Sequence, residues 1–163
     1  MTVIRRIVFG HDPRRTALRI LVLAAISFVT FKWVLIPIRP QGISMLPTYS
    51  PGEFSLVNRL AYLGKSPARG DVVAIMVAGP HVLYVKRVVG LPGERVSVTD
   101  GQVRINGVPL AEPYVHHRRP WTVDEVAVGQ TEYFVMGDNR GMAVGEHDFG
   151  RVDTTRILGR VLF

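Results

Sequence analysis

The sequence predicts a mainly β protein, an antiparallel β-sandwich or partly closed barrel that follows one N-terminal transmembrane helix. Two observations lead to this prediction. One apolar run near the N-terminus is long enough to cross a bilayer, and the rest of the chain consists of short β-branched runs between turn signals. We therefore divide the chain into a basic tail (1–16), a transmembrane anchor (17–38) and a β domain (40–163), with a small cap hairpin region around 95–130.

The anchor is predicted from the run ALRILVLAAISFVTFKWVLIPI, which extends from Ala17 to Ile38. Roughly 20 apolar residues cross the hydrocarbon core as a helix. The run is long enough if Arg19 lies at one edge and the Lys32 ammonium reaches the opposite interface, where Trp33 would also lie. We expect Pro37, together with Pro40, to end the helix.

The formal charge of +7 is unevenly distributed. Residues 1–39 hold seven basic residues and one acidic residue, whereas residues 40–163 hold 13 basic and 12 acidic residues. A nearly neutral body argues against a nucleic-acid partner. By the positive-inside rule, the basic tail predicts a cytoplasmic N-terminus and an extracytoplasmic β domain. A cleaved signal peptide and the buried helix of a soluble protein are the alternatives for this segment.

The β domain is predicted from seven short runs that are rich in β-branched residues and show no long helical period. These runs are Phe54–Val57, Val72–Val77, Val82–Val89, Val96–Val98, Val103–Ile105, Tyr133–Met136 and Ile157–Leu162. The segment VTDGQVRING predicts a hairpin with a primed turn at Asp100-Gly101. Leu56–Leu63 is the one segment in this region that could form a short helix. Many short strands at close spacing favour a sandwich or barrel.

Several standard catalytic and metal sites are missing from the sequence. There is no cysteine and no H-E-x-x-H motif, so we expect no thiol chemistry, no standard zinc site and no cofactor. No G-x-S-x-G motif occurs, and none of the six serines has a lysine three positions later. The basic tandem His116-His117-Arg118-Arg119 is interpreted as a solvated loop.

Lysine is rare in this chain, which contains 17 arginines and only three lysines. Lysine can lose its proton and act as a base, whereas arginine cannot. Lys86 lies in VLYVKRVVG, where it shares one face of a predicted strand with Tyr84 and Val88. If that face points inward, burial lowers the pKa of the lysine and makes it a candidate general base. The alternative is an edge strand that directs Lys86 into solvent.

Ser44 lies in QGISMLPT, a few residues after the apolar run, and is compatible with an ordinary turn residue or with a nucleophile. A neutral lysine amine beside a serine hydroxyl is a minimal hydrolytic unit, because the amine takes the proton as Oγ attacks a carbonyl. The Ser44 amide N–H would stabilise the developing oxyanion. Gly42 would let the substrate backbone approach closely.

Three segments occur in the same order as in one known family: Gly42–Thr48 (GISMLPT), Tyr84–Glu94 (YVKRVVGLPGE) and Met136–Arg140 (MGDNR). Together they resemble the bacterial type I signal peptidases, and Arg69–Val73 (RGDVV) matches a further, less specific block. The resemblance implies a membrane-bound serine endopeptidase with a largely antiparallel β fold. Its expected partners are the signal peptides of exported preproteins and the lipid bilayer. Its expected location is the bacterial plasma (inner) membrane, with a single membrane span.

The resemblance also implies roles for individual residues. By position, Ser44 is the nucleophile and Lys86 the general base. Substrates of the family bind in an extended form beside a strand, with small side chains at the first and third positions before the cut. The residues expected to bind them here are Gly42, Met45, Tyr84 and Val85.

The MGDNR block is expected to support the site. Its Asp138 and Arg140 would brace the strand that carries the lysine, and a catalytic role for the Asp138 carboxylate is the alternative. The sequence also departs from the family. Ala143 and Gly145 stand where many members have a serine and an aspartate, and Gly42 stands where some have an oxyanion-binding serine. The candidates to replace the lost groups are Glu146, His147 and Asp148.

Three other functions remain open from the sequence. The chain could be a Ser–Lys peptidase dedicated to itself or to one partner, or a membrane-tethered β module without activity. The departures at Gly42, Ala143 and Gly145 motivate the second of these. A Ser–His–Asp triad that uses His147 or His81 is the third.

Overall fold

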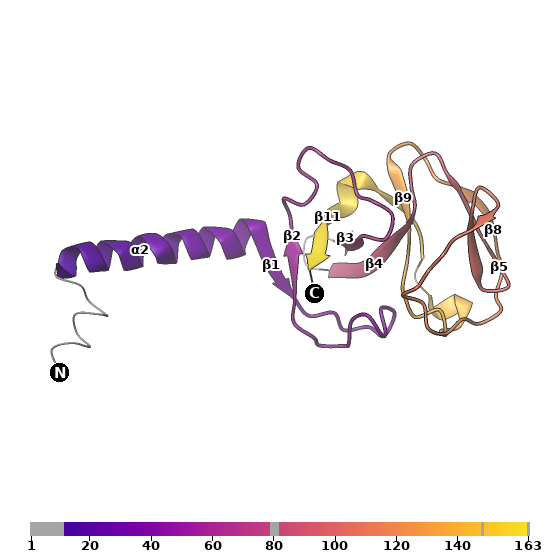
Figure 1. The fold of residues 1–163 in the computed structure, drawn as a ribbon, viewed down its shortest axis with the longest axis horizontal. Helices are drawn as coiled ribbons and strands as arrows, with labels where there is room; N and C mark the ends of the chain where they lie inside the picture. Colours follow the sequence, from indigo (N-terminus) through magenta and orange to yellow (C-terminus); the bar gives the residue numbers. More distant parts are fainter. Residues whose placement is uncertain (1–11, 79–81, 148, 163) are drawn as a thin grey trace.

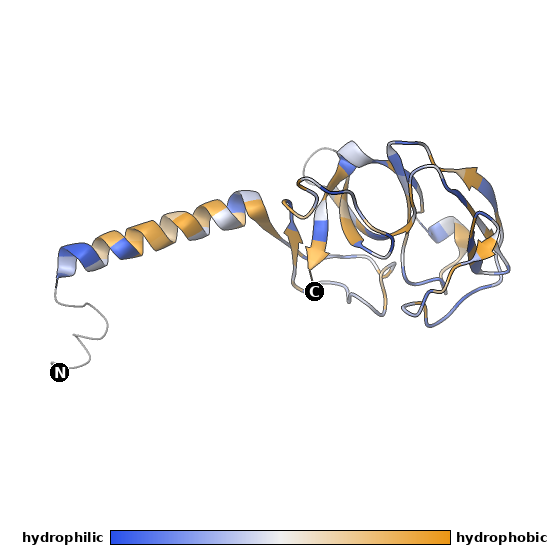
Figure 2. Ribbon diagram, turned by 45° about the horizontal axis from the view of Figure 1, so that its top comes forward, coloured by the Kyte–Doolittle hydropathy of each residue, from blue (hydrophilic) through white to orange (hydrophobic). Residues whose placement is uncertain are grey.

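The computed structural model describes residues 12–78, 82–147 and 149–162. A long helix projects from one end of a β body (Figure 1). Helix α2 (Pro13–Val29) begins after Asp12, whose carboxylate accepts hydrogen bonds from the backbone N–H groups of Arg14 and Arg15. The helix continues through a π-helical turn, η1 (Thr30–Val34). No residue of either segment is buried, and most of the helix surface is apolar (Figure 2).

The helix ends earlier than the sequence predicts. It spans Pro13–Val34, and the last four residues of the expected anchor form strand β1 (Leu35–Ile38) instead. The expected helix end at Pro37 is therefore wrong. β1 pairs with strand β2 (Ser55–Asn58), and the N–H of Arg59 donates to the carbonyl oxygen of Val34 at 2.9 Å. These sheet hydrogen bonds satisfy the backbone, so the chain leaves the helix before the proline.

The β body contains two antiparallel sheets, as the sequence predicts. The larger sheet has the strand order β1-β2-β11-β3-β4-β9-β10, and the smaller has the order β7-β6-β5-β8. The remaining strands of the larger sheet are β3 (Val72–Ala78), β4 (Val82–Gly90), β9 (Glu132–Met136), β10 (Gly150–Asp153) and β11 (Ile157–Leu162). The smaller sheet consists of β5 (Arg95–Thr99), β6 (Gln102–Ile105), β7 (Val108–Pro109) and β8 (Val123–Ala127). Two 3-10 turns, η2 (Val144–Glu146) and η3 (Thr154–Arg156), flank β10.

Three local predictions concern the hairpin, the cap region and a short helix. The hairpin at Asp100-Gly101 is confirmed, because β5 and β6 pair across it and both residues have positive φ angles of 52° and 73°. The region expected to form a small cap, around 95–130, contains the smaller sheet. The possible short helix over Leu56–Leu63 does not form. Its first residues belong to β2, and turns follow.

Three clusters of buried apolar side chains hold the body together. The first joins the two sheets and consists of Val89, Val96, Val98, Val103, Trp121, Val128, Phe134 and Met136. The second consists of Met45, Tyr49, Val57, Val72, Ala74, Val85 and Val161. The third consists of Val73, Ile75, Val88, Tyr133 and Val135. Successive residues of β3 alternate between the second and third clusters, so both faces of this central strand are buried.

Strand β4 is paired differently along its two edges. One edge pairs with β3 from Val82 to Arg87. The other edge pairs with β9 only from Arg87 onward. In the ranges that the structure describes, no strand pairs with this second edge over Leu83–Lys86. The edge is therefore open for an added strand.

Candidate active site

Ser44 lies in a tight turn between β1 and β2. The N–H of Leu46 donates to the carbonyl oxygen of Ile43 at 3.2 Å, and the N–H of Tyr49 donates to the carbonyl oxygen of Met45 at 3.0 Å. The side chains of Met45 and Tyr49 are buried in the second cluster and fix the turn to the sheet. Ser44 itself is half-buried.

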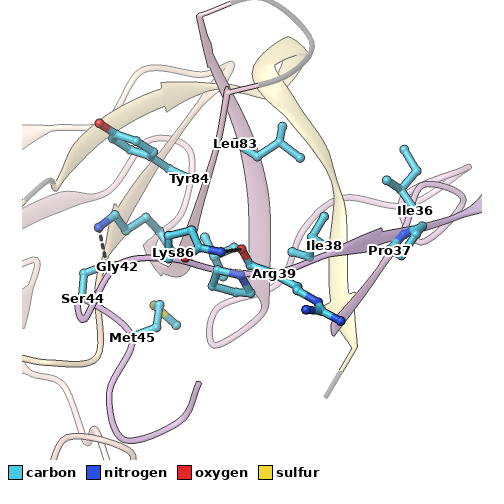
Figure 3. A pocket seen from close by; sticks show the side chains of 13 residues that line it. Ile36, Pro37, Ile38, Arg39, Gly42, Ser44, Met45, Leu83, Tyr84 and Lys86 are labelled. Atoms are coloured by element: carbon cyan, nitrogen blue, oxygen red, sulfur yellow. Dashed lines mark hydrogen bonds between the residues drawn. The ribbon is translucent and has the colours of Figure 1, made fainter. Parts of the chain in front are cut away.

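Lys86 reaches this turn from β4. Its side chain lies on the same face as Val88, as the alternation predicts, and it is only 3% exposed. The alternative of an edge lysine in solvent is therefore wrong. The Lys86 Nζ lies 2.9 Å from the Ser44 Oγ, within hydrogen-bond distance (Figure 3). It also lies 5.7 Å from the centre of the Tyr84 ring.

The segment after β9 holds the backbone of the Ser44 turn. The N–H of Asn139 donates to the Ser44 carbonyl oxygen at 2.9 Å, and its side-chain amide donates to the Ile43 carbonyl oxygen at 3.1 Å. Gly137 packs directly on the same backbone. A Cβ at this position would lie 3.1 Å from both the carbonyl carbon and the Cβ of Ser44, and less than 3.0 Å from its carbonyl oxygen. Only glycine fits here without moving the turn.

Asp138 links this segment to both the strand and the turn. Its carboxylate, 1% exposed, accepts hydrogen bonds from Arg87 Nε at 2.8 Å and Arg87 Nη2 at 2.5 Å. It also accepts one from the Thr48 hydroxyl at 2.6 Å. Burial acts against the charged guanidinium, but the Asp138 carboxylate outweighs burial, and the pKa of Arg87 is raised. Because Arg87 follows Lys86, this bidentate pair fixes the end of β4 relative to the Ser44 turn.

Arg140 is fully buried and has a different partner. It contacts both carboxylate oxygens of Glu112, at 2.6 and 3.3 Å, and its Nε donates to the Gly137 carbonyl oxygen at 2.7 Å. Asp138 and Arg140 were expected to act as a pair. Their side chains instead bind Arg87 and Glu112, so they brace two different sides of the same segment.

A groove of about 610 Å³ contains the Ser44–Lys86 contact (Figure 3). Gly42, Met45, Tyr84 and Val85, which the sequence analysis assigns to substrate binding, all line this groove. Its remaining lining residues are Ile36, Pro37, Ile38, Arg39, Pro40, Gln41, Ser44, Leu83 and Lys86. Residues of β1 and of the open edge of β4 therefore line the same groove.

The positions that depart from the family lie in open surroundings. A Cβ at Gly42 would meet only the Ser44 nitrogen, at 4.0 Å, and a Cβ at Gly145 would meet nothing within 4 Å. Ala143 immediately precedes the turn η2. Position 145 would therefore accept a side chain without a clash.

Three residues were considered as replacements for the side chains that the family has at positions 143 and 145, and they have different locations. Glu146 is exposed in η2, and Asp148 lies outside the described residues. His147 is buried beside Trp121, and its Nε2 lies 2.9 Å from the Asn139 carbonyl oxygen. His81, the other histidine considered for a triad, also lies outside the described residues. The basic group in contact with the Ser44 hydroxyl is Lys86.

Sequence reasoning missed three residues that shape the site. Arg87, Thr48 and Glu112 provide the partners of Asp138 and Arg140. Arg87 is adjacent to Lys86 and Thr48 ends the GISMLPT segment, so both were visible as motif positions without an assigned role. Glu112 carries no such signal, since it lies in an irregular loop.

The comparisons with known proteins agree on one family. The sequence profile described as "Signal peptidase, peptidase S26" matches residues 14–163. Signal peptidase I of Leptolyngbya laminosa is 35% identical over 127 residues, which cover 73% of this chain and 63% of the relative. Signal peptidase I V of Bacillus subtilis is 33% identical over 141 residues, which cover 77% of this chain and 83% of the relative.

One solved structure, of a signal peptidase I from Enterococcus faecalis, is 31% identical. It covers 59% of this chain and 97% of that chain, with a TM-score of 0.47. The profile match over nearly the whole chain and the Bacillus subtilis relative decide the assignment. The chain belongs to the bacterial type I signal peptidases of the peptidase S26 family, the family that its motifs resemble.

Proposed function

We propose that this chain is a membrane-anchored serine endopeptidase that removes N-terminal signal peptides from exported preproteins. Ser44 is the nucleophile, and Lys86 is the general base. The observation that carries the proposal is the 2.9 Å contact between the buried Lys86 Nζ and the Ser44 Oγ. Family membership alone indicates the reaction class, and this contact supports the two residues that perform it.

The chemistry requires an uncharged amine at Lys86. Burial among apolar side chains favours the neutral amine over the ammonium ion, because the ion loses its hydration. The neutral amine accepts the hydroxyl proton as the Ser44 Oγ attacks the scissile carbonyl. The resulting ammonium then gives this proton to the departing amine of the mature protein, which leaves an acyl-enzyme. A water molecule, deprotonated by the same amine, releases the signal peptide.

Stabilisation of the tetrahedral oxyanion is assigned to the backbone N–H of Ser44. Gly42 supplies no hydroxyl to this site. The hydrogen bond from Asn139 to the Ser44 carbonyl and the close contact of Gly137 keep the turn rigid, so the N–H need not reorient during the reaction.

Substrate binding follows from the groove and from the open edge of β4. An extended peptide added beside Leu83–Lys86 would be held by main-chain hydrogen bonds. Alternate side chains of this peptide would point toward the groove wall, where Met45, Tyr84 and Val85 lie. This arrangement accounts for recognition of the first and third residues before the cut, and the apolar wall favours small, uncharged side chains there.

Membrane attachment is assigned to the helix Pro13–Val34. Its 22 residues correspond to about 33 Å, which matches a hydrocarbon core of about 30 Å. By the positive-inside rule, the basic residues at its N-terminal end favour a cytoplasmic N-terminus and a β body on the extracytoplasmic face of the bacterial plasma membrane. Because the described residues contain one such helix, we assign a single membrane span to the chain.

The test is cleavage of a preprotein by the full chain in liposomes. Ser44→Ala and Lys86→Met should each abolish cleavage while the circular dichroism spectrum stays unchanged. Ser66→Ala and Lys65→Arg, in an exposed turn, are the matched controls and should retain full activity. Turnover by either site variant at the wild-type rate would refute the dyad.

The same assay separates the alternatives. Cleavage of several unrelated preproteins supports a general enzyme, whereas cleavage of one alone would indicate a dedicated peptidase. A wild-type chain that cleaves no preprotein would be an inactive β module.

A further inference from the structure

A second hollow borders the Ser44 turn. It has a volume of about 250 Å³ and is lined by Leu46, Pro47, His116, His117, Asp138 and Asn139. We call it the His116–His117 pocket. It shares no lining residue with the groove that holds the Ser44–Lys86 contact, although both border the same turn. The tandem histidines, which the sequence suggested to be a solvated loop, therefore lie beside the candidate active site.

The pocket is within reach of the scissile bond. Leu46 follows Ser44 by two residues, and the N–H of Asn139 donates to the Ser44 carbonyl oxygen at 2.9 Å. The groove takes the residues before the cut, so the residues after the cut must leave past the other border of the turn. An extended peptide advances about 3.3 Å per residue, so three residues cover about 10 Å. Because Leu46 and Asn139 of the pocket lie next to the Ser44 turn, we infer that the first residues of the mature protein pass the His116–His117 pocket.

The charges around the pocket favour an anion. Asp138 is its one carboxylate, and the bidentate contact with Arg87 already compensates this charge. Arg118 is partly compensated by Glu112 at 3.5 Å. The exposed Arg119 has no ion-pair partner within the described ranges. The loop 116–119 thus carries two imidazoles that line the pocket and, two residues further along the chain, an exposed arginine without an ion-pair partner in the described residues.

We propose that the His116–His117 pocket binds the first residues after the cleavage site and prefers an acidic side chain, aspartate or glutamate, among them. This inference rests on the proposed function, because it assigns the pocket to the same substrate. It adds a selection on the mature protein to the selection for small residues before the cut.

The experiment uses the full chain in detergent micelles and a set of peptides with one signal-peptide sequence. Each peptide carries Glu, Gln or Lys at the first, second or third position after the cut, and kcat/KM is measured at low ionic strength. We expect the Glu peptide to exceed the Lys peptide by about 3- to 10-fold at one of these positions, with Gln between them. The ratio should fall toward one as salt is added, because the groups are exposed.

Two variants test whether this preference comes from the loop that carries the pocket histidines. The double variant His116→Gln/His117→Gln should reduce the Glu/Lys ratio, and Arg119→Glu should bring it to one or below. Lys65→Glu makes the same change of charge in an exposed turn after β2 and should leave the ratio unchanged. Equal rates for Glu and Lys peptides at all three positions would overturn the inference, and so would a ratio that survives both pocket variants. Failure to cleave any peptide would instead refute the proposed function.

Discussion

Gly137→Ala tests whether the segment after β9 sets the geometry of the site. The added Cβ would lie 3.1 Å from the carbonyl carbon and the Cβ of Ser44, and less than 3.0 Å from its carbonyl oxygen. The atoms that the new Cβ would meet are the backbone and the Cβ of Ser44, and a change of side-chain rotamer cannot move them away. Restoring ordinary contact distances requires a displacement of about 1 Å. The hydrogen bond from Asn139 to the same carbonyl oxygen, now 2.9 Å, opposes this displacement.

The substitution is expected to impair catalysis while the protein stays folded. A misplacement of about 1 Å in a reacting group costs about 100-fold in rate, because the Ser44 Oγ no longer meets the Lys86 Nζ at 2.9 Å. Overpacking of this kind destabilises a domain by about 1–3 kcal/mol, which leaves the protein folded. We therefore expect kcat to fall about 100-fold, measured by preprotein cleavage in detergent, while a urea titration shows that the variant remains folded without denaturant.

Gly145→Ala is the matched control, because a Cβ there meets nothing within 4 Å. It should change kcat less than twofold. Wild-type turnover by Gly137→Ala, or an equal loss in both variants, would refute the reasoning that contact with Gly137 positions the nucleophile.

Three further predictions concern the oxyanion, the bracing ion pair and the response to alkaline pH. Gly42→Ser should raise kcat about tenfold or more in preprotein cleavage, because a side chain fits there beside the nucleophile's N–H and adds a hydroxyl donor. Asp138→Asn should lower the free energy of unfolding by about 3 kcal/mol in urea, since it leaves the Arg87 guanidinium charged and mostly buried. The pKa of Tyr114 is raised above its ordinary value by burial and then by Glu112, so the folded state holds this proton more tightly than the unfolded state. Its contribution to stability is complete below about pH 10 and is lost at higher pH, and Tyr114→Phe should show a flatter decline in urea midpoint above that pH.

The sequence predicted the interior strands and missed the edges. Each of the seven predicted runs overlaps a strand of the structure. The strands without a prediction are β1, β7, β8 and β10, which are the two outer strands of each sheet. None of the four contains a buried residue. An edge strand needs no continuous apolar run, so the pattern that identifies interior strands is weak in β7, β8 and β10. Strand β1 is apolar (LIPI) and was missed because it continues the apolar run of the predicted anchor.

The site was predictable where a motif carries the residue and not where a distant partner decides its role. Ser44 and Lys86 were chosen from short motifs, and the structure brings them within 2.9 Å. The role of Asp138 depended on which arginine it meets. Arg140 lies two residues from Asp138 along the chain, whereas Arg87 belongs to a different motif, and only the fold places Arg87 against the Asp138 carboxylate.

The early end of the helix has a consequence for substrate presentation. The four residues that the sequence assigned to the end of the anchor form β1, and Ile36, Pro37 and Ile38 of this strand line the groove. The groove therefore begins two residues after Val34, where the proposed membrane anchor ends. A signal peptide also spans the membrane as an apolar segment, and its cleavage region follows that segment directly. With the proposed function, a groove wall continuous with the anchor holds the dyad close to the bilayer surface, where such a cleavage region emerges.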